Sequence, residues 1–322
     1  MERIGLEARG DLDSLGGLPV TETKNSSLHA AKKAKNDEFY TMLSDIEKEL
    51  KHYKHHFSGK VVLCNCDDPE WSNFWKYFTL NFEHLGLAKI ISTHYAHGEP
   101  SYKLEYLGND QPPVKTPLVG DGDFRSEECL ELLKEADIVV TNPPFSLFKE
   151  YVAQLADNGK QFLIIGNFNA ITYKEIFKHI KENRLWLGVS PRSMQFKQPD
   201  GTLKDINACW LTNLSHHERN EELILCRTYA GNEHIYPKYE NYEAIEVKFV
   251  RDIPGDYDGA IGVPVTFLEK YNPEQFEIIW TTDRGGDGML ECLKKPHSRF
   301  DAPVVKGKGI YKRILIKRRL CQ

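Results

Sequence analysis

The sequence predicts an α/β protein with a doubly wound, mostly parallel sheet, followed by an irregular β-rich portion. Short apolar runs alternate with segments of helical spacing between residues 61 and 188, the pattern of successive β-α-β units. After residue 188 the apolar runs become shorter and lie among Pro, Gly, Asn and His. The length of 322 residues allows one large domain or two modest ones.

The amino-terminal part is predicted to contain a tail and one helix. Residues 1–26 mix Gly, Ser and charged side chains without periodicity, so we expect a mobile tail. A helix is predicted over residues 42–50, where apolar side chains recur at helical spacing. Thr41 is its predicted N-cap.

The first strand and helix of the sheet follow. Residues 61–65 form a short apolar run that predicts a buried strand. Asp68 and Pro69 resemble an N-cap and a first-turn proline, which predicts a helix over residues 69–86 that Gly86 ends. Its aromatic side chains recur every three or four residues, so we expect them to pack in the core. They are Trp71, Phe74, Trp75, Phe78 and Phe82.

The remaining elements continue the alternation. Strands are predicted over 88–93, 137–141, 161–166 and 184–188, and helices over 126–136, 146–159 and 171–183. The polar, proline-rich residues 98–118 predict a hairpin or a loop. Near the end, residues 310–317 alternate as a strand does. We therefore expect three parts, 1–26, 27–188 and 189–322, of which the last can return strands to the first sheet.

Asn142-Pro143-Pro144-Phe145 directly follows the predicted strand 137–141. The prolines fix the backbone between strand and helix and cannot donate a hydrogen bond. The Asn142 oxygen and a proline carbonyl can accept from an amino group on a flat ring, and Phe145 offers a stacking face. Two fixed acceptors favour the transition state in which positive charge develops on that nitrogen. The alternative is a turn in which the prolines only end the strand.

Composition limits the environment and the partners. Seven scattered cysteines favour reduced thiols, and no apolar run reaches membrane-spanning length. We therefore expect a soluble, cytoplasmic protein. The net charge is −5, yet the segment from Lys306 to Arg319 carries seven basic residues and no acid. This segregation predicts one local site for an anionic partner.

These features occur together with further blocks of sequence, and the whole resembles the EcoRI-type adenine-N6 DNA methyltransferases. The resemblance runs from about residue 30 to the end. It implies a Rossmann-like methyltransferase sheet, S-adenosylmethionine as the methyl donor and a flipped adenine in duplex DNA as the target. It also implies a restriction-modification system, with a nuclease that forms no stable complex with the chain, or an orphan methylase. The blocks are KNDEFYT (35–41), VVLCNCDDP (61–69), GDGDFRS (120–126), DIVVTNPPFSLF (137–148), ITYKE (171–175), WLTNL (210–214), YPKYENY (236–242) and GVPVTFLEKYNPEQFE (262–277).

The resemblance implies roles for the residues of the proline turn. Asn142 and Pro143 would hold the target amino group, and Pro144 would fix the turn. Phe145 would stack on the flipped adenine. No cysteine nucleophile and no covalent intermediate are implied.

The resemblance also implies a donor site. Asp123 and Phe124 would hold the adenine ring of the donor, with Asp121 as a companion. Two further groups would bind its methionine end: Phe39, Tyr40 and Thr41 from the amino-terminal block, and Asn65, Asp67 and Asp68 from the first loop. The Gly-rich turn of most methyltransferases is absent there, and residues 92–94, Ser-Thr-His, provide no carboxylate for the donor ribose.

Basic side chains supply candidates for DNA contact. The basic end predicts phosphate contacts from Lys312, Arg313, Lys317 and Arg318, together with Lys306 and Lys308. Arg192 and Gln195, with Lys197 and Gln198, have side chains able to contact base edges. The basic stretch 32–35 and the glycine-rich segment 281–289 with Arg284 are weaker candidates.

Other interpretations stay open. Methyltransferases of RNA adenine or of protein glutamine use the same turn, and a DNA-binding protein without donor binding would retain much of the sequence. Cys64 and Cys66 lack further partners at metal-ligand spacing, so we predict no metal site.

Overall fold

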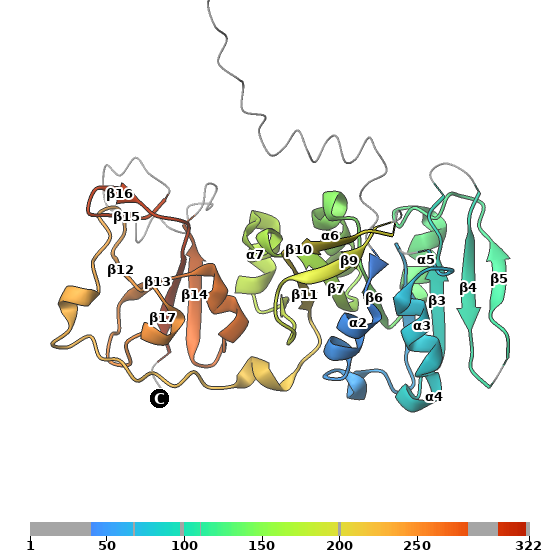
Figure 1. The fold of residues 1–322 in the computed structure, drawn as a ribbon, viewed down its shortest axis with the longest axis horizontal. Coiled ribbons are helices and arrows are strands. Elements are labelled where there is room, and N and C mark those ends of the chain that lie inside the picture. The colour runs from blue at the N-terminus through green and yellow to red at the C-terminus, as the bar shows by residue number, and fades with distance from the viewer. Residues whose placement is uncertain are drawn as a thin grey trace, which may run out of the picture. The chain divides into compact units, whose positions relative to one another are not determined.

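The computed structural model describes residues 40–66, 68–96, 100–109, 111–198, 201–282 and 302–319. Within them an eight-stranded sheet, the main sheet, has the order β5-β4-β3-β2-β6-β7-β11-β8 (Figure 1). Its parallel strands are β3 (Lys89–Thr93), β2 (Val61–Cys64), β6 (Ile138–Thr141) and β7 (Gln161–Asn167). The other strands are β4 (Tyr102–Tyr106), β5 (Val114–Pro117), β8 (Trp186–Leu187) and β11 (Ala208–Thr212).

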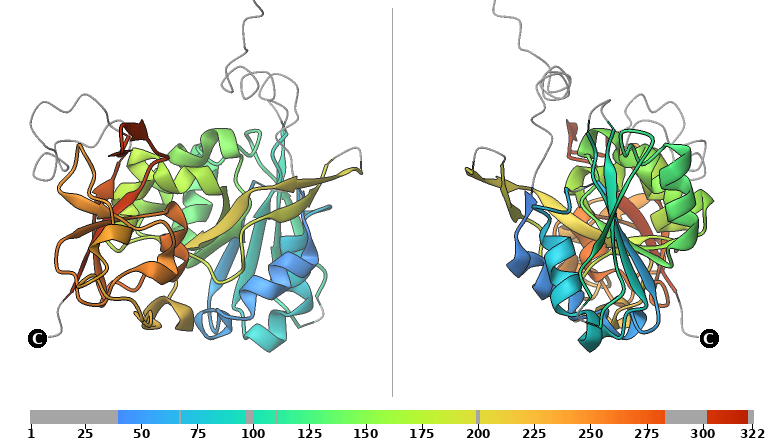
Figure 2. Two further views of the ribbon diagram at one scale, coloured as in Figure 1. Left: turned by 60° about the vertical axis from the view of Figure 1, so that its left-hand side comes forward. Right: turned by 90° about the vertical axis from the view of Figure 1, so that its right-hand side faces the viewer.

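Helices cover both faces of the main sheet (Figure 2). One apolar cluster packs α2 (Leu43–Leu50), α3 (Asn73–Leu80) and α4 (Phe82–Leu85) on one face. The other packs α5 (Glu127–Glu135), α6 (Phe148–Asp157) and α7 (Lys174–Lys181) on the opposite face. The two helix layers confirm the predicted doubly wound α/β fold. Parallel strands that are buried on both faces need a helix layer on each side.

The predicted helix over residues 69–86 begins later and is broken. Ser72, rather than Asp68, is the N-cap, and its Oγ accepts from the backbone N–H groups of Phe74 and Trp75. Asp68 instead caps a turn through a 2.9 Å hydrogen bond from the Glu70 N–H. Trp71 therefore lies outside the helix with 66% of its surface exposed, so the prediction that it packs in the core was wrong. Gly86, at φ +64°, ends α4 as predicted.

The predicted N-cap of the first helix was also wrong. Met42 holds the cap position of α2 and makes no side-chain cap hydrogen bond. Thr41 belongs to β1 (Tyr40–Thr41), which pairs with β9 (Met194–Lys197). Pairing across the chain thus overrides the local capping preference of Thr41.

The polar segment 98–118 contains a hairpin, as expected. β4 pairs antiparallel with both β3 and β5. The chain returns to this sheet after residue 189, since β11 pairs antiparallel with β7 and with β8. A second hairpin joins β9 to β10 (Leu203–Ile206) and pairs with β1.

The remaining chain forms the predicted β-rich portion. Its four-stranded sheet, the C-terminal sheet, has the order β12-β13-β17-β14. The strands are β12 (Ala244–Glu246), β13 (Ala260–Val263), β14 (Phe276–Thr281) and β17 (Ile314–Arg318), and a small hairpin joins β15 (Val304–Val305) to β16 (Lys308–Gly309). The strand near the end is confirmed, but Ile314, Leu315 and Ile316 are all buried. Burial does not alternate because β17 is a central strand covered on both faces.

The C-terminal sheet packs against α7. The rings of Phe177 and Trp280 meet edge to face at 5.4 Å, and one apolar cluster runs from Leu63 in β2 to Ile316 in β17. The two sheets are therefore held by a shared core. In the part of the chain described here, no helix is long and apolar enough to cross a membrane.

Candidate active site

The candidate site lies at the carboxyl ends of β2 and β6. The chain passes from β2 to β3 on one side and later to β6 on the other, so the connections diverge between β2 and β6. Ligands of open α/β sheets bind at such a switch point. Asn65 follows β2 and Asn142 follows β6, and the Thr141 hydroxyl donates to the Asn65 carbonyl. The predicted donor and target segments therefore meet here.

The proline turn is rigid and largely buried. Asn142 has 7% of its surface exposed, and Pro143 is buried. Pro144 caps a short 3-10 helix, Phe145–Leu147, through a 3.0 Å hydrogen bond from the Leu147 N–H to its carbonyl. Phe145 is only half-buried, and its ring meets Phe196 of β9 edge to face at 6.3 Å. This edge-to-face contact helps to hold the Phe145 ring in place.

Tyr151 of α6 joins two predicted donor-site residues. Its hydroxyl donates to Asn65 Oδ1, and its ring contacts Phe124 edge to face at 5.0 Å. Burial raises the pKa of the Tyr151 phenol well above its usual value, so the hydroxyl stays protonated as a donor. Tyr151 was not predicted from sequence, because a tyrosine on the core face of a helix carries no separate signal.

Asp68 lies between the first loop and the end of β3. Tyr102 donates to its Oδ1 at 3.2 Å, and His94 Nε2 lies 3.7 Å from its Oδ2. The rings of His94 and Tyr102 stack with centroids 5.0 Å apart. A carboxylate therefore reaches the end of β3 from the neighbouring loop, although β3 itself ends without an acid.

The segment 120–125 is pressed against the same strand end. A Cβ on Gly122 would lie 1.9 Å from the His94 carbonyl oxygen, and Gly122 has φ +81°, a conformation that favours glycine. Arg125 binds the Asp123 carboxylate through Nε at 2.9 Å and holds the Asp123 pKa below its usual value. Asp123 is thus ionised at neutral pH, and Asp121 Oδ1 accepts from its N–H at 3.0 Å.

A buried carboxylate connects the amino-terminal helix to the segment after β8. Glu49 is fully buried and accepts from Val189 N–H at 2.9 Å, Ser190 N–H at 2.7 Å and Tyr53 hydroxyl at 2.8 Å. These bonds fix the start of the β9–β10 hairpin relative to α2. An acid on the apolar face of the predicted helix 42–50 was the signal that could have identified Glu49.

The basic residues near the end are spread along β17 and the segment before it. Ile314, Leu315 and Ile316 of β17 separate Lys312 and Arg313 from Lys317 and Arg318, so Arg313 and Lys317 are roughly 13 Å apart along the strand. Arg318 donates to the Gly255 carbonyl, while Lys317 is exposed.

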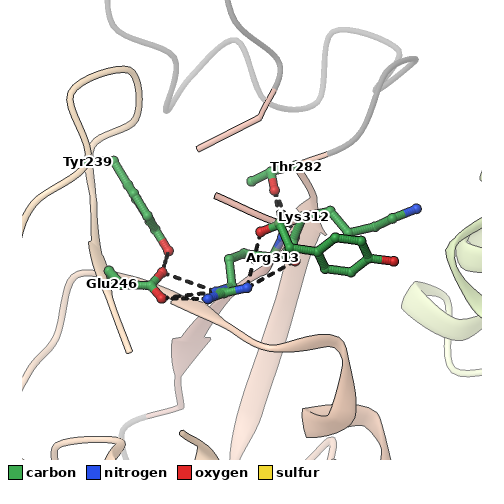
Figure 3. A network of polar contacts seen from close by, with 6 residues as sticks. Tyr239, Glu246, Thr282, Lys312 and Arg313 are labelled. Carbon is green, nitrogen blue, oxygen red and sulfur yellow. Dashed lines mark hydrogen bonds and ion pairs between the residues drawn. The ribbon is translucent and has the colours of Figure 1, made fainter. Parts of the chain in front are cut away.

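Arg313 takes part in a polar network inside the C-terminal portion (Figure 3). Its guanidinium binds Glu246 with Nη2–Oε1 at 2.7 Å, and both side chains are nearly buried. Tyr239 donates to the same carboxylate. This network gives Arg313 a structural role inside the C-terminal portion. Lys312 points away from the network and donates to Thr172 Oγ1 at 2.8 Å.

Two predicted readout residues lie on either side of the start of β9. Arg192 Nε pairs with Glu269 Oε1 at 2.7 Å. Gln195 is exposed on the hairpin and donates to Asp205 Oδ1 at 3.3 Å. Phe39, Asp67, Arg284 and the basic stretch 32–35 lie outside the described residues.

The sheet order, the switch point and the Asn-Pro-Pro-Phe turn define the class as a Rossmann-like methyltransferase. The family model of the adenine-specific methyltransferase EcoRI matches residues 27–319. The chain belongs to this family, and it is an adenine-specific DNA methyltransferase.

Similarity to known relatives extends over nearly the whole chain. The type II methyltransferase M.EcoRI of Escherichia coli is 46% identical, over 92% of this chain and 98% of the relative. M.MpnI of Mycoplasma pneumoniae is 41% identical, over 90% of this chain and 97% of the relative. M.MgeORF184P of Mycoplasma genitalium is 37% identical, over 89% of this chain and 97% of the relative.

Proposed function

We propose that the chain transfers a methyl group from S-adenosylmethionine to the N6 amino group of an adenine flipped out of duplex DNA. The observation that carries this proposal is the position of Asn142 and its proline turn at the switch point, joined to Asn65 through Thr141. An adenine inside a duplex cannot reach a turn this buried, so the base must leave the stack.

The residues present fit this donor. It carries an ammonium, a sulfonium and ribose hydroxyls, and the carboxylates of Asp68, Asp121 and Asp123 line the loops around the ends of β2 and β3. Thr93, the last residue of β3, is 1% exposed, and its Oγ1 has no hydrogen-bond partner among the described residues. When bound, the donor supplies an electrophilic methyl group.

The proline turn performs the chemistry on the target side. The Asn142 side-chain oxygen and the Pro143 carbonyl accept from the two amino hydrogens. These two bonds turn the nitrogen lone pair out of the plane of the adenine ring. Each bond contributes about 1–3 kcal/mol, and it strengthens as positive charge develops on the nitrogen. Phe145 stacks on the flipped ring, and direct displacement needs no covalent intermediate with the chain.

We propose a division of labour along the chain. Residues 27–188 bind the donor and hold the catalytic turn, while residues 189–322 contact DNA. Tyr40 and Thr41 close over the methionine end of the donor, together with Phe39. Lys312 and Gln195 face the duplex, together with Lys306 and Lys308. A cognate restriction endonuclease would act on the same DNA sequence without a stable complex with this chain.

The test is transfer of labelled methyl from S-adenosylmethionine to duplex DNA, followed by analysis of the nucleosides. We expect label in N6-methyladenine. Label in RNA or in protein glutamine, with unlabelled DNA, would overturn the proposal. Calorimetry of donor binding gives a separate readout, since the absence of binding would favour a DNA-binding protein without catalysis.

A further inference from the structure

A pocket of about 240 Å³ lies between the main sheet and the C-terminal sheet. On one side it is lined by Phe168, Asn169 and Thr172, which follow β7. On the other side it is lined by residues of the C-terminal portion, including Thr266 and Tyr311. The lining contains two arginines, two amides and three hydroxyls, but no carboxylate among the described residues. This chemistry suits a ligand rich in hydrogen-bond acceptors.

The pocket is close to the catalytic turn. Thr141 of β6 pairs with Ile164 of β7, so Asn142 is level with the residue after Ile164. Phe168 lies three residues further along, which corresponds to roughly 10 Å. The pocket therefore lies close enough to the catalytic turn to contact DNA that is bound there.

Arg192 enters this pocket in a fixed orientation. Its guanidinium lies over the Phe168 ring at 4.7 Å, and its Nε pairs with Glu269 at 2.7 Å. Nη1 and Nη2 make no hydrogen bond to other residues in the described ranges, and the side chain is 39% exposed. A planar fork that is stacked and paired on one edge loses little freedom when the other edge binds.

We propose that Arg192 is a specificity-determining residue that donates two hydrogen bonds to O6 and N7 of one guanine in the recognition site. Those two acceptors lie in the major groove, and paired contact with arginine is the commonest specific protein–base contact. The pocket also presents two amides and three hydroxyls, which match the several polar groups of a base edge. Phe168 and Glu269 are positioning residues for Arg192. This inference rests on the proposed methylation of duplex DNA.

The experiment first maps the motif that the wild-type protein methylates in genomic DNA. It then measures kcat/KM on duplexes in which each position of that motif is changed in turn. Arg192→Lys keeps the charge but loses the planar fork. We expect its discrimination at a single guanine position to fall by about 10- to 100-fold, with discrimination elsewhere retained.

The matched control is Arg184→Lys. Arg184 is also exposed and paired with an acid, Glu182. Arg184 precedes β8, which runs parallel to β7. It therefore lies at the amino end of these strands, whereas the pocket lies beyond the carboxyl end of β7. Discrimination between bases by the Arg184→Lys variant should equal that of the wild type at every motif position. Glu269→Gln should reduce discrimination at the same guanine position as Arg192→Lys, by a smaller factor. If Arg192→Lys does not fold, Glu269→Gln serves as the test.

Three results would overturn the inference while the proposed function stands. They are a motif without guanine, unchanged discrimination in the variants, and a uniform loss of rate with a shallower salt dependence, which would mark a phosphate contact. Wild-type protein that leaves DNA without N6-methyladenine would instead overturn the proposed function, and the inference with it.

Discussion

At the scale of single residues, the candidate site depends on contacts that local sequence does not encode. Asn142 and its prolines were predicted from sequence because the turn directly follows a buried strand. The contact of Tyr151 with Asn65 and Phe124 was not predicted, since 86 residues separate Tyr151 from Asn65. The position of Asp68 beside His94 was missed for the same reason.

Asn142→Ala tests the acceptor role directly. We expect methyl transfer to fall by about 10²-fold, because one preorganised transition-state contact is lost. Donor affinity and thermal stability should stay near the wild-type values. The measurement combines single-turnover kinetics with donor calorimetry, and turnover like that of the wild type would rule out the mechanism.

Gly122→Ala tests the close approach between segment 120–125 and β3. A Cβ there meets the His94 carbonyl, whereas a Cβ on Gly59, which has a similar positive φ of +71°, meets no atom within 4 Å. Gly59→Ala should cost about 1–2 kcal/mol of stability from backbone strain alone. Gly122→Ala should cost about 1–3 kcal/mol more and should also weaken donor binding. Equal effects in denaturation and calorimetry would contradict the packing described here.

At the scale of elements, sequence periodicity predicted the strands and helices of the main sheet but not all of their ends. The helix over 69–86 was predicted too long because Asp68-Pro69 resembles a helix start, while Ser72 makes the actual cap. Thr41 was assigned to a cap because its pairing with Phe196 of β9 is long-range. Burial of β17 on both faces likewise depends on tertiary packing.

The Glu49 contacts predict an element-scale effect on stability. Glu49→Ala leaves two buried backbone N–H groups and the Tyr53 hydroxyl without their acceptor, and we expect a loss of about 3 kcal/mol. Glu47→Ala in the same helix removes an exposed side chain and should change stability by less than about 0.5 kcal/mol. Urea denaturation of both variants measures the difference, and similar midpoints would contradict the role of Glu49.

At the scale of the whole molecule, the charge count predicted an anionic partner but not where it binds. Sequence places seven basic residues together, whereas β17 carries them to two ends of a strand. Arg313 and Arg318 are used inside the protein. Lys306 and Lys308 are exposed on the side of Lys312, which contacts the main sheet through Thr172.

The salt dependence of DNA binding distinguishes the two ends. Replacement of Lys306 and Lys308 by Ala should reduce the magnitude of the negative slope of log affinity against log salt by about 1–2, because up to two phosphate contacts are lost. The double variant Lys317→Ala, Arg319→Ala removes the same charge at the other end of β17 and should change the slope less. A larger change of slope in the Lys317→Ala, Arg319→Ala variant would place the duplex at the Lys317 end of β17.

Methylation mapping in a cell tests most directly whether the protein methylates adenine in duplex DNA. The protein is expressed in a bacterial host without endogenous DNA methylation, and the genome is sequenced by a single-molecule method that detects modified bases. We predict N6-methyladenine within one short motif, and its loss with Asn142→Ala. Unmodified genomic DNA in the presence of folded, donor-binding protein would contradict it.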